Sequence, residues 1–171
     1  SVSSSFSIVS WPSGDAAVES VFKKRLDGVV VWGGEAAVSA YRQGLGPGCR
    51  LVAFGPKLSF GVVSRAGLRR VGVREAARRA ARDVAWWDQN ACASPQTLFV
   101  QGPRDDAFLD ALAAELKRLA RAFPSGAPSP DAAASAVEER HRALAAELTG
   151  RGRLLAASDG SWSVAWRKEP A

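Results

Sequence analysis

The segment GVVVWGGEAAVSAYRQ, residues 28–43, joins a continuous run of β-branched residues to a helical pattern through two glycines. A strand that is apolar at every position is typical of parallel sheets, whose strands are buried on both faces. A helix that follows such a strand after a tight turn is the unit from which α/β folds are built. The segment therefore predicts an α/β fold that contains a parallel sheet.

The rest of the chain continues this alternation. Further strands are predicted at 5–10, 49–54, 59–64 and 97–101. Helices are predicted at 16–26, 73–88, 102–123 and 130–148. The last segment, LLAASDGSWSVAW, predicts an antiparallel hairpin that turns at Asp159–Gly160 and places Trp162, Val164 and Trp166 on one face. The expected fold class is α/β, with a largely parallel sheet flanked by helices and a C-terminal antiparallel hairpin.

Two of the helical patterns also predict a buried face. The small side chains of one face of helix 73–88 permit close approach to a sheet. The members of this face are Ala77, Ala80, Ala81, Val84 and either Trp87 or Asp88. The expected core stripe of helix 102–123 is Phe108, Leu109, Leu112, Leu116, Leu119 and Phe123. Capping residues are expected at Asp15 or Ser13 for the first helix and at Ser129, before Pro130, for the last.

The composition of the 171 residues is that of a globular protein, with 47% hydrophobic and 23% charged side chains. We expect no membrane span, since no run of about 18 apolar residues occurs, and no secretory signal, so a cytoplasmic location is predicted.

With Cys49, Cys92 and His141 as the only cysteines and histidine, neither a disulfide framework nor a metal site is expected. The net charge of +6 favours an anionic partner of some kind. Because the chain starts at Ser1 and has no methionine, we expect an internal segment of a longer protein.

Cys92 lies in a helix-to-strand connection among small and amide residues. As a free cysteine it is more often a small buried hydrophobe than a nucleophile, but an accessible loop sulfur favours reactivity. Cys49 begins a predicted strand, which indicates packing. His141 lies at the border of the apolar stripe of helix 130–148, together with Val137 and Leu144, and is poorly placed to act as a base for Cys92.

Two features favour anion binding, each with a simpler explanation. The glycines at 33 and 34 open a helix whose free N–H groups suit a phosphate, although a tight turn needs glycine in any case. Arginines between Arg65 and Arg82 form a basic face, although most charge runs on helices are solvated faces. No aromatic interleaving or helix-turn-helix pattern accompanies these arginines, so nucleic acid is not expected as a partner.

Three segments in order, VVVWGGEAAVSAYR, LVAFGPKLSFGVVSR and ARDVAWWDQNACASPQTLFV, resemble the bacterial long-chain fatty acyl-CoA reductases of the luminescence type. This family belongs to the aldehyde dehydrogenase superfamily, and the resemblance spans about residues 5–102. It implies an aldehyde-dehydrogenase-like fold in which Cys92 is the nucleophile that accepts an acyl group from a thioester. NADPH would then reduce the acyl-cysteine to an aldehyde.

The resemblance also assigns roles to other residues. Gly33, Gly34 and Glu35 match positions beside the cofactor phosphates, and Phe54 and Gly55 match the stretch that approaches the nicotinamide. The Cys92 backbone N–H would be one oxyanion donor, whereas the superfamily's second donor is an asparagine from an upstream segment. Residue type alone does not assign that role to Asn90. At Ala53 this chain lacks the glutamate with which oxidative relatives activate water, so the thioester is protected from hydrolysis.

The resemblance divides the chain into the second part of a nicotinamide-cofactor domain, residues 1–57, and an incomplete thiol-bearing catalytic domain, residues 58–171. The predicted function is NADPH-dependent reduction of a fatty acyl-CoA or acyl-carrier thioester to the aldehyde. We expect little or no turnover from these 171 residues alone, and a homo-oligomer or partner subunits in the parent protein. The alternative is a non-catalytic binding module that uses the arginine face for a protein or nucleic-acid partner.

Overall fold

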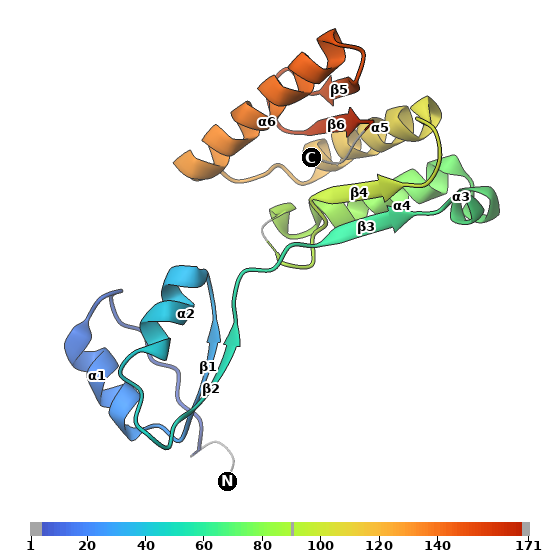
Figure 1. Cartoon of the computed structure of the whole chain (residues 1–171). Coiled ribbons are helices and arrows are strands. Elements are labelled where there is room, and N and C mark those ends of the chain that lie inside the picture. Colours follow the sequence, from blue (N-terminus) through green and yellow to red (C-terminus); the bar gives the residue numbers. More distant parts are fainter. Residues whose placement is uncertain (1–4, 90, 169–171) are drawn as a thin grey trace. The chain divides into compact units, whose positions relative to one another are not determined.

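The computed structural model describes residues 5–89 and 91–168. The chain divides into two compact units, Ser1–Lys57 and Leu58–Ala171, referred to below as the N-terminal and C-terminal units. Figure 1 shows that both units combine helices with short strands. The prediction of an α/β chain is therefore confirmed, while the strands form three separate two-stranded sheets in the described residues. An aldehyde-dehydrogenase-like fold stays a prediction.

The N-terminal unit contains α1 (Ala16–Arg25), β1 (Gly28–Trp32), α2 (Glu35–Arg42) and β2 (Arg50–Phe54). Asp15 caps α1, because its side chain accepts a hydrogen bond from the backbone N–H of Val18. β1 and β2 are parallel, and their register pairs Gly28 with Arg50. The buried core is small and consists of Val29, Val31 and Val38.

The predicted strand at 5–10 is wrong, because the structure has no strand in these residues. Its apolar side chains are exposed, with Phe6 at 73% and Ile8 at 86% of their full accessibility. The segment has the alternation of a strand but is hydrogen-bonded to neither β1 nor β2. A strand is stable only when another strand satisfies its backbone groups, so the sequence pattern alone does not form one here.

The C-terminal unit begins with β3 (Phe60–Val63), α3 (Arg65–Val71) and α4 (Val73–Ala85), and the short 3₁₀ helix Trp86–Gln89 follows. β4 (Thr97–Val100) and α5 (Asp106–Ala122) come next, and then α6 (Pro130–Leu148), β5 (Gly152–Ala156) and β6 (Ser163–Arg167). β3 pairs with β4 in parallel, and β5 pairs with β6 in antiparallel. Ser129 caps α6 ahead of Pro130, and the C-terminal hairpin forms, both as predicted.

The core of the C-terminal unit lies where α4 meets α5. The alanine face of α4 is buried, and Ala77 and Ala81 have no accessible surface. Small side chains there allow Phe108, Leu112 and Leu116 of α5 to pack closely. The same cluster is contacted by Val63 and Val100 of the β3–β4 pair and by Trp162 and Val164 of the hairpin, so both sheets of this unit contribute to the core at α4 and α5.

Two details of the predicted core are wrong. Phe123 is 75% exposed, because α5 ends at Ala122 and Phe123 takes a non-helical backbone conformation. The helix predicted for residues 73–88 ends at Ala85, so Trp87 and Asp88 do not continue its buried face. Among the described residues, no helix is both long and apolar enough to cross a membrane.

Candidate thiol and glycine-turn sites

The loop that carries Cys92 starts where α4 stops. It comprises residues 86–96, of which Asn90 lies outside the described residues, and is called the thiol loop below. Trp87, Asp88 and Gln89 all have left-handed backbone conformations, with φ of 60°, 54° and 56°. Non-glycine residues rarely adopt this conformation, and three in a row require support from the surrounding structure. Their effect is to break α4 sharply and to direct the chain into an irregular connection.

Hydrogen bonds within the thiol loop supply that support. The hydroxyl of Ser94 donates to the carbonyl oxygen of Trp86 at 2.7 Å, and Ser94 is only 3% exposed. The side-chain amide of Gln89 donates to the carbonyl oxygen of Pro95 at 3.4 Å. Because a buried hydroxyl is stable only with a partner, Ser94 attaches the second half of the loop to the end of α4.

Cys92 lies at the outer side of this loop, and its side chain is exposed. The interpretation of Cys92 as a buried packing residue is therefore wrong. The backbone N–H of Ser94 donates to the carbonyl oxygen of Ala91 at 3.0 Å, which closes a β-turn with Cys92 and Ala93 at its centre. The thiol is thus displayed on a defined turn and is accessible to a substrate.

Ser59 connects the thiol loop to the neighbouring strand. Its hydroxyl donates a hydrogen bond to the carbonyl oxygen of Cys92. Its own carbonyl oxygen accepts a hydrogen bond from the N–H of Gln96 at 3.1 Å. Ser59 was not predicted as a site residue, because the pairing of β3 with β4 brings it to Cys92 from 33 positions earlier in the chain.

Cys49 has a different environment. It directly precedes β2, is half-buried and packs against the cluster of Val29, Val31 and Val38. Its predicted packing role is consistent with this position. His141 is exposed on α6.

The second predicted site lies at the carboxyl ends of β1 and β2. The glycine turn, residues 32–35, connects β1 to α2, and the N–H of Gly33 donates to the carbonyl oxygen of Phe54 at 3.3 Å. Since Trp32 and Phe54 are partners in the parallel register, Gly33, Gly34 and Glu35 lie next to Phe54 and Gly55. Of the five residues predicted to contact a cofactor, Gly33 and Phe54 are joined by a hydrogen bond, and Gly34, Glu35 and Gly55 follow them at the same edge of the sheet.

The two glycines of this turn differ in the space around them. A Cβ atom added to Gly33 would lie 2.9 Å from the Cβ of Ala37, whereas one added to Gly34 would meet nothing within 4 Å. Gly34 is the N-cap of α2 and makes no side-chain capping bond. The first N–H groups of α2 are thus available to an anion, while the exposed carboxylate of Glu35 in the same turn adds a negative charge.

An exposed aromatic pair borders the glycine turn. The rings of Trp32 and Phe54 are stacked with their centroids 5.0 Å apart and an angle of 7° between their planes. Both side chains are exposed, Trp32 at 72%. Trp32 was not predicted as a surface residue, although its place at the end of a strand before two glycines could have indicated it. The pair offers a flat apolar surface beside free backbone N–H groups.

The arginine face is partly neutralised by acidic neighbours. The carboxylate of Glu75 accepts hydrogen bonds from Arg78 at 2.8 Å and from Arg79 at 2.7 Å. These hydrogen bonds, that from Arg78 first, lower the pKa of Glu75 to about 2. Arg78 and Arg79 therefore form ion pairs within their own helix, which leaves less of their charge for a binding partner.

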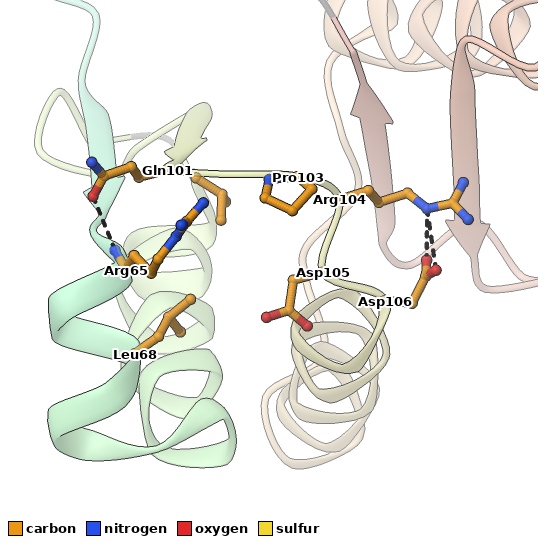
Figure 2. Close-up of a pocket in the computed structure, with 8 residues that line it drawn as sticks. Arg65, Leu68, Gln101, Pro103, Arg104, Asp105 and Asp106 are labelled. Atoms are coloured by element: carbon orange, nitrogen blue, oxygen red, sulfur yellow. Dashed lines mark hydrogen bonds and ion pairs between the residues drawn. The ribbon is translucent and has the colours of Figure 1, made fainter.

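A hollow of about 370 Å³ lies in the C-terminal unit, at the carboxyl end of β4 (Figure 2). It is lined by Arg65, Leu68, Val100, Gln101, Pro103, Arg104, Asp105 and Asp106. Cys92 precedes the opposite end of β4 and does not line this hollow. The hollow and the thiol are therefore separate features.

The polar groups of this hollow support the ends of helices. The side-chain oxygen of Gln101 accepts from the N–H of Arg65 at 3.1 Å, and Asp105 caps α5. Arg104 pairs with Asp106, as Figure 2 shows, and Arg153 also donates to Asp106. Desolvation raises the pKa of Asp106, but the hydrogen bonds from Arg153 and Arg104 outweigh it and leave the pKa below its usual value. These interactions account for most of the charged lining residues without a ligand.

Comparisons with known proteins agree on one family. The sequence model of the family described as "Acyl-CoA reductase (LuxC)" matches residues 1–171. A protein of Photorhabdus luminescens described as a long-chain acyl-protein thioester reductase is 34% identical over 125 residues, which are 72% of this chain and 25% of that protein. Proteins with the same description from Photorhabdus laumondii and Vibrio harveyi are 31% and 30% identical over 72% and 76% of this chain. The chain spans about a quarter of the length of these relatives.

Proposed function

Because this chain belongs to the acyl-CoA reductase (LuxC) family, we propose that the protein containing it reduces a long-chain acyl thioester to the aldehyde. In this proposal Cys92 accepts the acyl group and NADPH is the reductant. The observation that carries the proposal is the exposed thiol of Cys92 on a β-turn held by hydrogen bonds. A thiol displayed in this way suits nucleophilic attack, whereas a thiol that fills a core does not.

We propose that the thiol reacts by acyl transfer from the thioester. The Cys92 thiolate attacks the carbonyl carbon of the thioester, forms an acyl-cysteine and expels the carrier thiolate, which takes a proton from water. Exchange of one sulfur for another at a carbonyl suits a thiolate nucleophile, because the leaving group is of similar basicity. The backbone N–H of Cys92 is the group we propose as a donor to the developing oxyanion.

The glycine turn fits a dinucleotide cofactor. The uncapped N-terminus of α2 offers N–H groups to a phosphate, Gly34 leaves open space above them, and the Trp32–Phe54 pair offers a flat surface to a ring. When bound, NADPH would supply the hydride that reduces the acyl group to the aldehyde. We propose that Gly33, Gly34, Glu35, Phe54 and Gly55 contribute to this site, within an aldehyde-dehydrogenase-like cofactor domain that includes residues 1–57. Residues 58–171 then belong to the thiol-bearing domain.

Ala53 supports reduction over hydrolysis. The side chain of Ala53, in β2, is a methyl group and cannot take a proton from water. If it replaces the glutamate of oxidative relatives, as the family resemblance implies, the acyl-cysteine lacks a base for hydrolysis and persists until it is reduced. We therefore expect an acyl-enzyme that is long-lived in buffer.

The proposed function is tested with the natural protein that contains this chain, NADPH and two acyl donors. Dodecanoyl-CoA is one donor, and a dodecanoyl thioester on a carrier protein is the other, because the family and its relatives are described by different thioesters. Aldehyde trapped as a hydrazone and consumption of NADPH at equal rates are expected with at least one donor. No aldehyde from either donor, or reduction that persists in Cys92→Ala, would contradict the proposal. From the 171 residues alone we expect acylation with little turnover.

A further inference from the structure

Ser59 is hydrogen-bonded both to the strand pair β3–β4 and to Cys92. The hydrogen bond from Gln96 N–H to Ser59 carbonyl oxygen, 3.1 Å long, lies immediately before the first register pair of β3 and β4, Phe60 with Thr97. It extends the strand pairing by one step, so the backbone of Ser59 has a fixed position. Ser59 is also half-buried, which limits the orientations open to its hydroxyl.

The hydroxyl of Ser59 donates to the carbonyl oxygen of Cys92. Cys92 is the second residue of the turn closed by the hydrogen bond from Ser94 to Ala91. In a β-turn the closing bond uses the carbonyl of the first residue and the N–H of the fourth, so it leaves the peptide between the two central residues to other partners. Ser59 supplies such a partner and thereby fixes the peptide plane that follows Cys92.

The orientation of that plane bears on the thiol. Fixing the Cys92 carbonyl restricts the rotation of the backbone about Cys92, and therefore the directions of its N–H and of its Cα–Cβ bond. Acyl transfer needs both at once, because the sulfur must reach the carbonyl carbon while the N–H faces the carbonyl oxygen. Ser94 and Gln89 attach the loop to its own ends, whereas Ser59 acts directly on the residue that reacts.

We propose that Ser59 is a positioning residue for Cys92, one that orients the Cys92 backbone for attack on a thioester without touching the substrate. The inference rests on the proposed function. The step that it assists forms the bond between the Cys92 sulfur and the acyl carbon and breaks the thioester bond to the carrier sulfur. The departing thiolate keeps the electron pair of that bond and is protonated by water, so no oxidant or reductant is needed.

Acylation and alkylation separate positioning from simple exposure of the thiol. Alkylation by iodoacetamide needs an accessible thiolate but develops no oxyanion, whereas acylation by dodecanoyl-CoA needs the oriented N–H as well. The experiment uses the full 171-residue chain with Cys49→Ala, so that Cys92 is its one remaining cysteine. The rates of acylation and of alkylation are both measured by intact-mass spectrometry. We expect Ser59→Ala to slow acylation about 10- to 100-fold and to change alkylation by less than about twofold, since accessibility is retained.

Ser59→Thr keeps the hydroxyl and is the matched rescue variant. It is expected to restore acylation to within about threefold of the parent chain, since the hydrogen-bond donor remains. Acylation unchanged in Ser59→Ala, or both rates lowered in the same proportion, would overturn the positioning role while leaving the proposed function standing. If the chain with Cys49→Ala and an unchanged Ser59 is alkylated at Cys92 but not acylated, the proposed function is wrong, and the role of Ser59 with it.

Discussion

The two units of the chain each pair parallel strands and each contain one cysteine, but they place the thiol differently. In the N-terminal unit, Cys49 directly precedes β2 and packs against the buried valines. In the C-terminal unit, four residues lie between Cys92 and the start of β4, and Cys92 itself is a central residue of a β-turn. The difference shows that the length and geometry of the connection decide whether a thiol before a strand is packed or presented.

The two units also differ in the size of their hydrophobic cores. Three buried valines form the core of the N-terminal unit, whereas α4 and α5 supply the larger core of the C-terminal unit, which includes Phe108. Three consecutive left-handed residues cost free energy, which the surrounding structure has to offset. The strained thiol loop therefore belongs to the unit with more buried apolar surface.

The largest expected effect separates the two cysteines. In the natural protein, Cys92→Ala should lower the rate of thioester reduction at least about a thousandfold, because the nucleophile is lost. Cys49→Ala should leave that rate within about twofold, because Cys49 only packs. Aldehyde formation at saturating donor and NADPH measures both. If the two variants lost comparable amounts of activity, the proposed difference between the packed thiol of Cys49 and the exposed thiol of Cys92 would be wrong.

The next effect concerns the two cores. Phe108→Ala should destabilise the chain by about 3–5 kcal/mol, because Phe108 is 1% exposed and its removal leaves a cavity. Val38→Ala in the N-terminal unit removes two methyl groups and should cost about 1.5 kcal/mol. Phe123→Ala is the matched control on the same helix pattern and, since Phe123 is exposed, should change stability by less than about 0.5 kcal/mol. Urea unfolding measures all three, and equal costs for Phe108 and Phe123 would contradict the assigned core.

A smaller effect separates the two glycines of the glycine turn. Gly33→Ala should cost about 1–3 kcal/mol, because its Cβ would come within 2.9 Å of the Cβ of Ala37. Gly34→Ala has open space and an ordinary negative φ of −66°, so it should be tolerated. Unfolding midpoints and titration with NADPH, followed by tryptophan fluorescence, measure the two variants. A tolerated Gly33→Ala would mean that the turn adjusts more freely than the close contact indicates.

The smallest effect is a pH dependence from α4. The hydrogen bonds from Arg78 and Arg79 lower the pKa of Glu75 from an ordinary value of 4.5 to about 2. A carboxyl group with a lowered pKa in the folded state binds fewer protons there than in the unfolded state, so its stabilisation is present above pH 4.5 and is lost as the pH falls through 2. Glu75→Gln should remove this part of the pH dependence. Because Glu75 is at the surface, the change should be small at physiological salt, and thermal melts between pH 2 and pH 5 in low salt measure it.

Local signals predicted much of this fold. Features that depend on residues close in sequence were predicted correctly. They are the capping of α1 by Asp15 and of α6 by Ser129, the hairpin at Asp159–Gly160 and the alanine face of α4. The strand at 5–10 could not be judged in this way, because a strand depends on a neighbour that satisfies its backbone groups. Phe123 was misplaced for a local reason, since the helix ended one residue before it.

The candidate sites were predictable to different degrees. Gly33, Gly34 and Glu35 are consecutive, and Phe54 is the last residue of the paired strand β2, so a parallel arrangement alone brings them to the same edge. Cys92 was identified from its residue type and from family resemblance, but its exposure follows from left-handed residues that have no clear signal in WWDQ. Ser59 could not be predicted from the sequence, because its contact with Cys92 depends on the register of β3 with β4.

The central claim is that the presented thiol, and not the packed one, accepts the acyl group. The most direct measurement is peptide mapping of the chain after incubation with dodecanoyl-CoA and quenching in acid. We predict a thioester-linked dodecanoyl group on the peptide that contains Cys92, removable by hydroxylamine, and no such group on the peptide that contains Cys49. An acyl group on both cysteines in proportion to their reaction with iodoacetamide, or on neither, would contradict the claim.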